Sequence, residues 1–489
     1  MRACSPMRHE ILLNVTPLET RVAVVEQGMV QELLIERATH QGLVGNVYVG
    51  QVARVLPGMQ ACFVDIGLER SAFLHAKDIP QSATGRDALI SSLVTEGQRL
   101  LVQVTKDPIG TKGARLTAEV SLPARHLVLM PFANHVGISQ RIEDDDNRDL
   151  LKRMAQDALD AQGLELGVIV RTAGKGHTQT DFEHDLAYLK RLWDEIQSME
   201  NTVKPPTCVY QDLSLSHRVI RDQIRPDTER VLVDSQETFD RMVGFSAKYV
   251  PDVVNRLQHY AGERPIFELY QIEDELERAL GRRVELKSGA YMVIDETEAM
   301  TTVDVNTGGF VGAHTLEQTV FRTNLEAAVA IGRQLRLRNL GGIIVIDFID
   351  MEDEEHRRQV FRTLERSLEP DPVKTRLNDF NEAGLVVLTR KRTRERLSDL
   401  LQEACSECRG TGKTKTPETL CYEIFRAILR EARAFSAETT TVIAAPVVID
   451  RLIDEESQAL ADLEAFIHRP IRLQVDAHFA RDRFEVVLA

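Results

Sequence analysis

Two aspartates and an asparagine stand at the ends of two short apolar segments near the middle of the chain. Asp304 and Asn306 end the run TTVDVN, and Asp347 ends the run GGIIVID. Each run is apolar and β-branched apart from its acid, which is typical of a buried strand. Carboxylate and amide oxygens suit Mg²⁺, and a bound Mg²⁺ polarises a phosphodiester oxygen and generates a hydroxide nucleophile. If the three side chains meet in space, they could hydrolyse a phosphodiester.

The segment between the two acids predicts that they do meet. Residues 316–335 carry apolar or small residues at helical spacing, and Gly341 and Gly342 form a stop signal. A strand, a crossover helix and a second strand usually place the two strands in parallel, with both acids near one edge of the sheet. Asn306 lies two positions beyond Asp304 and so points to the same side. The alternative is that each aspartate is an isolated cap or salt-bridge partner.

Four motifs carry a resemblance to a known family. TTVDVNTGGFVG, GGIIVIDFIDM, LTRKRTRERL and CSECRGTG occur in the same order as in the ribonuclease E/G family, and the likeness runs from about Glu10 to the C-terminus. The resemblance implies an α+β multidomain protein. The expected parts are an RNase H-like subdomain split between 1–36 and 216–280, an OB-fold RNA-binding barrel (37–122), a 5′-sensor region (123–215), a DNase I-like catalytic subdomain (281–400), a zinc-link (401–413) and a small C-terminal α/β domain (414–489).

Short strands and turn signals alternate from residue 42 to residue 122, which favours a small OB-type barrel on the pattern alone. Phe63 and Phe73 lie on two of these predicted strands, and Lys106 and Lys112 follow. Such barrels stack bases on aromatic side chains and hold the backbone of a single strand with lysines. A Phe on a strand is more often a core residue. The resemblance favours RNA binding, because both positions match aromatic residues that hold RNA in the family.

A candidate phosphate site follows a predicted strand at 168–170. Arg171 and Thr172 lead into the glycine-rich turn AGKGHT, which offers a guanidinium, a hydroxyl and backbone N–H groups. The turn is not a P-loop, because Gly-Lys-Gly-His lacks the required Ser or Thr, and a plain hairpin loop is the alternative. The resemblance implies that Arg171 and Thr172 bind the 5′-monophosphate of a substrate RNA, with Val128 on the other wall of the pocket.

Three further segments carry weaker predictions. Residues 253–262 and 272–281 show helical spacing with glycine stops, so both are expected to be helices. On a helix surface, the basic run from Arg390 to Arg396 could be only a solvated face, which is the alternative to a functional role. Because the run comes soon after Asp347 in the chain, we expect it to contact RNA phosphates near the metal site.

Cys405 and Cys408 form a C-x-x-C motif with the spacing of half a zinc site. The chain holds no second such pair, so two chains could complete one tetrahedral set. A redox C-x-x-C is the alternative, but the sequence suggests no thioredoxin-like βαβ context around it. The resemblance implies a structural Zn²⁺ link between protomers and at least a homodimer. Cys421 is expected to serve only in packing.

Composition sets broad limits. The 489 residues, 43% of them hydrophobic, exceed what one core usually supports, so several domains are expected. A net charge of −15 argues only weakly against a nucleic-acid partner, since local clusters decide phosphate contact. Six scattered cysteines argue against a disulfide framework. Without a run of 18 apolar residues or a signal-peptide core, a soluble cytoplasmic protein is expected, with Met7 as an alternative start.

The resemblance therefore implies a Mg²⁺-dependent endoribonuclease that cuts single-stranded, A/U-rich RNA and leaves 5′-phosphate and 3′-hydroxyl ends. Asp304 and Asp347 would hold the ion, and Asn306 would orient the acids or the phosphate. Substrates with a 5′-monophosphate would be preferred, and the cellular tasks would be 16S ribosomal RNA 5′-end maturation and messenger turnover. A non-catalytic RNA-binding protein is the second reading. An NTP-using enzyme is the third, which the missing phosphate loop disfavours.

Overall fold

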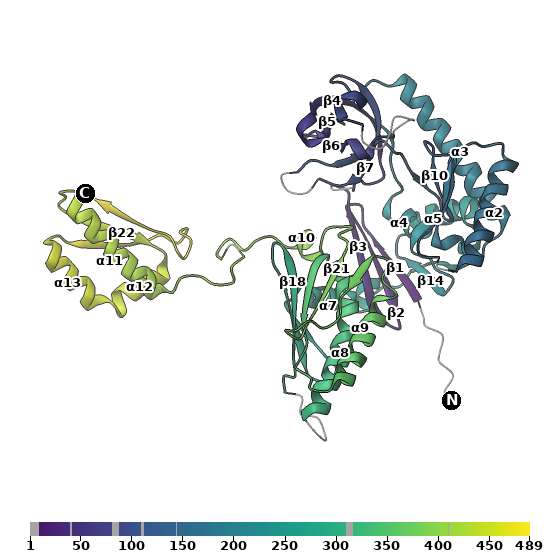
Figure 1. Cartoon of the computed structure of the whole chain (residues 1–489). Helices are drawn as coiled ribbons and strands as arrows, with labels where there is room; N and C mark the ends of the chain where they lie inside the picture. The colour runs from purple at the N-terminus through teal and green to yellow at the C-terminus, as the bar shows by residue number, and fades with distance from the viewer. Residues whose placement is uncertain are drawn as a thin grey trace. The chain divides into compact units, whose positions relative to one another are not determined.

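The computed structural model describes residues 9–39, 42–80, 88–108, 112–142, 144–309, 316–408 and 410–489 (Figure 1). The chain divides into two units, residues 1–396 and 397–489. In the described ranges, no helix has the length and apolar character needed to cross a membrane. Residues 310–315 lie outside them, and the first three of these residues end the first quoted motif.

One sheet joins the start of the chain to residues far along it. Its order is β15-β14-β1-β2-β3, with β1 parallel to β14 and antiparallel to β2. The strands are β1 (His9–Val15), β2 (Glu19–Glu26), β3 (Met29–Arg37), β14 (Thr228–Val233) and β15 (Leu257–His259). Helices α4 (Leu215–Asp222) and α5 (Gln236–Tyr249) contribute buried Val219 and Met242 to its core. That this split sheet is RNase H-like stays a prediction.

The helix predicted at 253–262 is wrong. The chain forms a short 3-10 helix over Pro251–Arg256 and then β15, whose Leu257 pairs with Val231 of β14. The open edge of β14 supplies backbone partners that local spacing does not encode, so tertiary pairing overrides the helical pattern. The helix predicted at 272–281 is confirmed as α7 (Ile272–Leu280).

Five strands close into the expected small barrel. Their order is β4-β5-β6-β8-β7, and β7 pairs back with β4. The strands are β4 (Val47–Leu56), β5 (Ala61–Asp65), β6 (Ala72–His75), β7 (Arg99–Lys106) and β8 (Arg115–Thr117), and β13 (Thr207–Tyr210) extends β4 at one side. Cys62, Leu74, Val102 and Leu116 are fully buried inside.

A third sheet has the order β11-β12-β10-β9. It comprises β9 (Leu122–Pro123), β10 (Leu127–Met130), β11 (Val136–Ile138) and β12 (Gly167–Val170), and it packs with α2 (Asp145–Ala161) and α3 (Gln179–Thr202). Buried Phe182 and Leu186 of α3 contribute to this core. The carboxylate of Asp185, also on α3, accepts the backbone N–H groups of His126 and Leu127 over 2.7 and 3.0 Å and so holds the start of β10.

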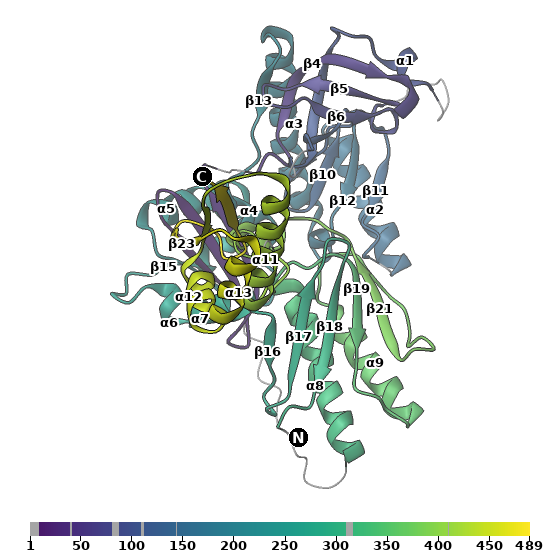
Figure 2. The same ribbon diagram turned by 90° about the vertical axis from the view of Figure 1, so that its left-hand side faces the viewer.

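The sheet that carries the two acids has the order β16-β17-β18-β19-β21-β20. Its strands are β16 (Arg283–Glu285), β17 (Tyr291–Glu296), β18 (Met300–Asn306), β19 (Gly342–Asp347), β20 (Thr375–Leu377) and β21 (Leu385–Arg390). Helices α8 (Leu316–Leu337) and α9 (Glu354–Leu368) pack against one face of this sheet (Figure 2). On that face, Val303, Val305 and Ile346 share a core with helix residues such as Ile331 and Val360. The predicted strand, helix and strand are all present.

The second unit is a small α/β fold. Its elements are α10 (Leu397–Leu401), α11 (Pro417–Ala434), β22 (Thr440–Ala444), α12 (Pro446–Asp454), α13 (Ser457–Ile467), β23 (Ile471–Val475) and β24 (Phe484–Leu488). The sheet order is β23-β22-β24, with β22 parallel to β23 and antiparallel to β24. Cys421 is fully buried in its core, so its predicted packing role is confirmed.

Candidate functional site

Asp304 and Asp347 are direct partners in the parallel pairing of β18 with β19. Neighbouring strands run about 4.8 Å apart, which brings the two carboxylates to one spot. Val303, Val305 and Ile346 point into the core under α8 and α9. Because side chains alternate along a strand, Asp304 and Asp347 face the other side of the sheet, where both are exposed.

Asn306 extends this group along β18. Its Nδ2 donates a hydrogen bond to Oδ2 of Asp304 over 2.8 Å, which holds that carboxylate in one orientation. Partial burial raises the pKa of Asp347, and the nearby charges of Asp304 and Asp350 raise it further. Two carboxylates that repel each other at an exposed surface form a site whose charge a divalent cation would neutralise.

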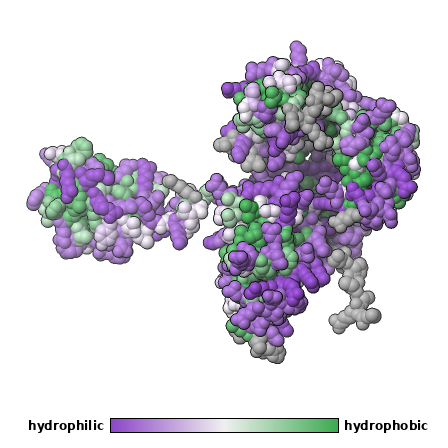
Figure 3. Space-filling view, in the orientation of Figure 1, coloured by the Kyte–Doolittle hydropathy of each residue, from purple (hydrophilic) through white to green (hydrophobic). Residues whose placement is uncertain are grey.

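The donor set fits a hard cation. Two carboxylates and an amide oxygen match what Mg²⁺ takes from a protein while it keeps several waters and a substrate phosphate. The hydrogen bond from Asn306 uses one of the four Asp304 lone-pair sites and leaves the others open to an ion. The face around the pair is not wholly polar, since Ile343 on β19 is 44% exposed. Figure 3 shows hydrophobic residues gathered over this sheet on the visible side.

A row of aromatic and basic residues crosses the outside of the barrel. Phe63 of β5 lies opposite Phe73 of β6, with ring centroids 6.1 Å apart at 71° and both rings half-buried. On the next strands, Arg115 of β8 pairs with Phe73, and Lys106 of β7 pairs with Arg115. On the other side, Arg54 of β4 pairs with Phe63. Residues opposite one another share a face, so the row forms a continuous strip.

Neither phenylalanine belongs to the barrel core, and an RNA-binding role for them stays a prediction. The residues next to them in sequence, Cys62, Val64 and Leu74, fill the barrel, whereas Phe63 and Phe73 keep part of each ring in solvent. Lys106 and Lys112 are exposed. The sequence reasoning missed Arg54 and Arg115, because only the strand pairing reveals that they continue the row.

Arg171 and Thr172 lie at the end of β12 as predicted. The Arg171 guanidinium donates to the Ala124 carbonyl and to Asp222, each over 2.6 Å, so it is held in place with donors left over for a phosphate. The Thr172 hydroxyl lies 3.1 Å from that of Ser139. Val128 of β10 pairs with Ile169, two residues before Arg171, and therefore lies on the same face.

The chain matches known proteins over almost its whole length. A model of the Ribonuclease E/G family matches residues 121–393, and one of the family's thioredoxin-like domain matches residues 404–488. Ribonuclease G of Salmonella typhimurium (strain SL1344) is 50% identical over 495 residues, covering 99% of this chain and all of that protein. The chain belongs to the ribonuclease E/G family.

Other members align over different shares of their length. Ribonuclease G of Haemophilus influenzae is 46% identical, covering 98% of this chain and 99% of that protein. Ribonuclease E of Escherichia coli (strain K12) is 36% identical, and the match covers 93% of this chain but 43% of that protein. The length of this chain therefore corresponds to the family members named ribonuclease G.

The basic run is not placed as the sequence suggested. Residues 391–396 are irregular rather than helical, and Arg390 ends β21. In the antiparallel pairing of β19 with β21, Arg390 lies opposite Gly342, whereas Asp347 lies opposite Leu385. Five residues of strand, about 17 Å, therefore separate Arg390 from the acid pair. Arg390 is instead buried, with its guanidinium 2.6 Å from Asp371.

The C-x-x-C segment lies before α11 in the second unit. Cys405 is exposed and Cys408 is half-buried. The backbone N–H groups of Gly412 and Gly410 lower the pKa of the Cys408 thiol, and both glycines have positive φ angles that permit this tight turn. Thiolates in a turn of this kind fit Zn²⁺.

The sequence disfavoured a redox role for Cys405 and Cys408 because no thioredoxin-like βαβ context was expected around them, and that expectation is wrong. A thioredoxin-like family model covers this region, and β22, α12 and α13, and β23 do form a parallel βαβ unit. The motif itself lies outside that unit, in the segment that precedes α11. A thioredoxin-type redox pair stands at a helix start within the βαβ context, so the position of Cys405 and Cys408 still favours metal binding.

Proposed function

We propose that this protein is an endoribonuclease that cleaves single-stranded RNA with a divalent cation, Mg²⁺, held by Asp304 and Asp347. The observation that carries the proposal is the pairing of these two acids across adjacent parallel strands. Membership of the ribonuclease E/G family and the aromatic and basic strip on the barrel support it. The same features disfavour a non-catalytic RNA-binding role, which would not require two repelling carboxylates at an exposed surface.

In this mechanism the side chains position the reacting groups. Asp304 and Asp347 hold the cation, and Asn306 keeps the Asp304 carboxylate oriented through its 2.8 Å hydrogen bond. When bound, Mg²⁺ supplies charge neutralisation and an activated water. Attack of water on phosphorus with departure of the 3′-oxygen leaves a 5′-phosphate on one product and a 3′-hydroxyl on the other.

The barrel strip and the Arg171 region would bind the substrate. Bases stack on Phe63 and Phe73, and Lys106 and Lys112 contact the backbone. The side chains of Arg171 and Thr172 donate hydrogen bonds to the 5′-monophosphate of the RNA. A 5′-phosphorylated substrate is therefore cleaved faster than a 5′-hydroxyl one. The cellular substrates would be the precursor of 16S ribosomal RNA at its 5′ end and messenger RNA.

The active assembly would contain at least two chains. Cys405 and Cys408 of one chain and the same residues of another would complete a tetrahedral zinc site. Replacing both cysteines with serine should lower zinc content from one ion per two chains to none and reduce the mass in solution, measured by light scattering. An unchanged mass together with unchanged zinc content would exclude the link. The Cys421→Ser variant is the matched control, because Cys421 is buried elsewhere.

The cleavage experiment uses two oligoribonucleotides of identical sequence, one 5′-phosphorylated and one 5′-hydroxylated, with and without EDTA. Without EDTA, the wild type should cleave both oligoribonucleotides and should cleave the 5′-phosphorylated one faster. With EDTA, it should cleave neither. Asp304→Asn and Asp347→Asn should bind RNA but lose cleavage by about 10²-fold or more, while Asp295→Asn on neighbouring β17 serves as the control. Full cleavage by both variants would reject the proposal. Binding without cleavage by the wild type would favour the non-catalytic alternative.

A further inference from the structure

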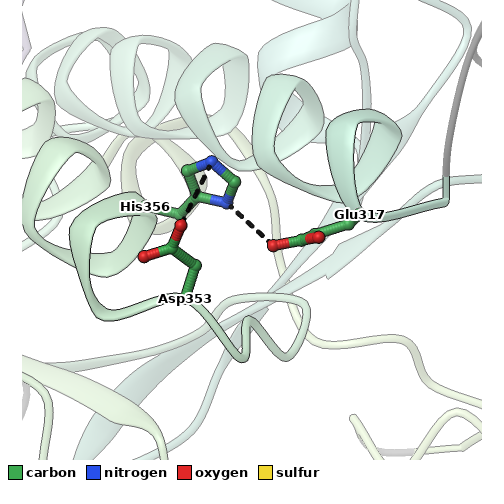
Figure 4. A group of neighbouring side chains, drawn as sticks. All are labelled: Glu317, Asp353 and His356. Atoms are coloured by element: carbon green, nitrogen blue, oxygen red, sulfur yellow. Dashed lines mark ion pairs between the residues drawn. The ribbon is translucent and has the colours of Figure 1, made fainter.

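Three potential metal ligands converge where two helices begin. Glu317 lies in the first turn of α8, Asp353 is the N-cap of α9, and His356 lies in the first turn of α9 (Figure 4). Nδ1 of His356 is 3.5 Å from Oε1 of Glu317, and Nε2 is 3.9 Å from Oδ2 of Asp353. One donor atom from each residue lies within 4.8 Å of the others.

The 3.5 Å between Nδ1 of His356 and Oε1 of Glu317 suits two ligands of one ion better than a hydrogen bond. An imidazole binds one ion through one nitrogen, so for Asp353 the relevant limit is the 4.8 Å within which one atom of each residue lies. Hydrogen bonds from a ring nitrogen to oxygen span about 2.7–3.2 Å, and Nδ1 of His356 is buried with no such partner among the described residues. Buried polar atoms are normally partnered, so this nitrogen calls for one. Bonds of about 2.1 Å arranged tetrahedrally keep ligand atoms about 3.4 Å apart, which is close to the separation between His356 and Glu317.

The surroundings already hold the ligands in place. The His356 ring stacks on Phe321 of α8, with centroids 4.1 Å apart and planes at 15°. The other Asp353 oxygen, Oδ1, accepts the backbone N–H of Glu355 over 2.7 Å, which leaves Oδ2 directed toward the ring. Contacts of this kind orient ligands before an ion arrives, and they reduce the cost of ordering side chains on binding.

The cluster is separate from the proposed catalytic site. Helices α8 and α9 pack on the face of the sheet that carries Val303 and Ile346, whereas Asp304 and Asp347 face the other side. The two sites are nevertheless linked through the chain. In sequence, α8 follows the strand that ends with Asp304 and Asn306, and α9 follows the strand that ends with Asp347.

We propose that Glu317, Asp353 and His356 form a second divalent-metal site, selective for a transition metal such as Mn²⁺ or Zn²⁺. One imidazole with two carboxylates favours these ions over Mg²⁺, which takes oxygen ligands. Waters complete the coordination, because both acids are exposed. The ion ties the start of α8 to the start of α9.

Mn²⁺ binding measured without RNA tests this site independently of cleavage. The probe is Mn²⁺ alone, titrated by electron paramagnetic resonance into the wild type and into the double variant Asp304→Asn, Asp347→Asn. The double variant should keep one Mn²⁺ site whose spin-echo spectrum shows coupling to an imidazole nitrogen. Adding His356→Ala, or in a separate variant Glu317→Gln, should weaken this binding by about tenfold or more and, for His356→Ala, remove the nitrogen coupling.

The matched control is His478→Ala. His478 also faces a carboxylate, with Nδ1 3.4 Å from Asp476, but it is fully exposed and lies in the other unit. Its removal should leave Mn²⁺ binding unchanged. The proposal is overturned if the double variant binds no Mn²⁺, if the bound ion shows no nitrogen coupling, or if both cluster variants bind as tightly as their parent. Circular dichroism establishes that each variant is folded, and Glu317→Gln alters only an exposed helix start.

Discussion

Asp304 lies directly opposite Asp347 across the parallel strands β18 and β19. The pairing places two carboxylates together although α8 and its flanking segments separate them in the chain. Asn306 adds an amide that hydrogen-bonds to Asp304. Because Asn306 contacts Asp304 through this hydrogen bond, its role in orienting the carboxylate can be tested while both acids are kept.

Asn306→Ala should weaken activation by the metal without weakening RNA binding. The amide orients Asp304, and loss of such a supporting contact typically costs about 10- to 100-fold in metal affinity or activity. The Mg²⁺ concentration for half-maximal cleavage should rise by that factor, while the RNA dissociation constant stays constant. Asn201→Ala on α3, where the side chain bonds only to its own helix, is the control. An unchanged Mg²⁺ requirement would show that Asn306 does not support the site.

Phe63→Ala and Phe73→Ala should each weaken binding of single-stranded RNA. Stacking of a base on an aromatic side chain is worth about 1–3 kcal/mol, so the dissociation constant should rise roughly 5- to 150-fold per substitution. Fluorescence anisotropy with a labelled oligoribonucleotide measures the change. Phe132→Ala provides the comparison, because this ring is 53% exposed but lies outside the barrel. Equal losses for all three variants would contradict a stacking role specific to the strip.

Charge removal on the barrel should change the salt dependence of RNA binding. Each lysine that neutralises an RNA phosphate contributes about 0.7 to the slope of log affinity against log salt for single strands. Lys106→Gln and Lys112→Gln should each reduce the slope by about this amount. Arg115→Gln should reduce it less, because Arg115 already pairs with Asp78 over 3.0 Å. Lys152→Gln on α2 should have no effect, and a similar change there would mean that the slope reports overall charge alone.

Arg390 should matter for stability and not for RNA contact. Its side chain is 4% exposed and pairs with the fully buried carboxylate of Asp371. Arg390→Met leaves that carboxylate buried without its partner, which typically costs about 3–5 kcal/mol in free energy of unfolding. Urea denaturation measures the loss, and RNA affinity at low temperature should stay constant.

Two companion variants separate the ion pair from general effects of charge on stability. Arg390→Met with Asp371→Leu should recover most of the stability, since an apolar pair can replace a buried ion pair. Lys391→Gln, at an exposed neighbour, should be neutral. If Arg390→Met lost RNA affinity while its free energy of unfolding stayed close to that of the wild type, Arg390 would contact RNA phosphates as first predicted.

Asp185 should make stability depend on pH in a defined direction. Burial raises the pKa of Asp185 to about 6, although the N–H groups of His126 and Leu127 donate to it. In the unfolded chain this carboxyl titrates near pH 4. Between these values the native state binds more protons, so the stability contributed by the group falls as pH rises.

The matched measurement compares the wild type with Asp185→Asn from pH 4 to pH 7. The asparagine can still accept a backbone hydrogen bond but does not titrate. Relative to this variant, the wild type should lose about 2 kcal/mol of unfolding free energy over the range, from a shift of roughly two pKa units. Asp194→Asn, an exposed position on the same helix, should show no such trend. A constant difference between wild type and Asp185→Asn would exclude the raised pKa.

The sequence alone determined the local features of this protein and their chemistry. Apolar spacing predicted β18, α8 and β19, and strand alternation placed Asp304 and Asn306 on one side. The five-stranded barrel and the second unit were also predicted, because turn residues and hydrophobic periodicity act over short distances.

Only the tertiary structure decided which of these features meet. The sequence predicted that Asp304 and Asp347 lie near one edge, and the strand pairing set them directly opposite each other. The tertiary structure also places Arg390 five strand residues from the acids, forms a strand at 257–259 and pairs Arg115 with Phe73. It also brought His356 against Glu317 from another helix. The physical reason is that strand register and helix packing depend on contacts between residues far apart in the chain, and local spacing carries no information about those partners.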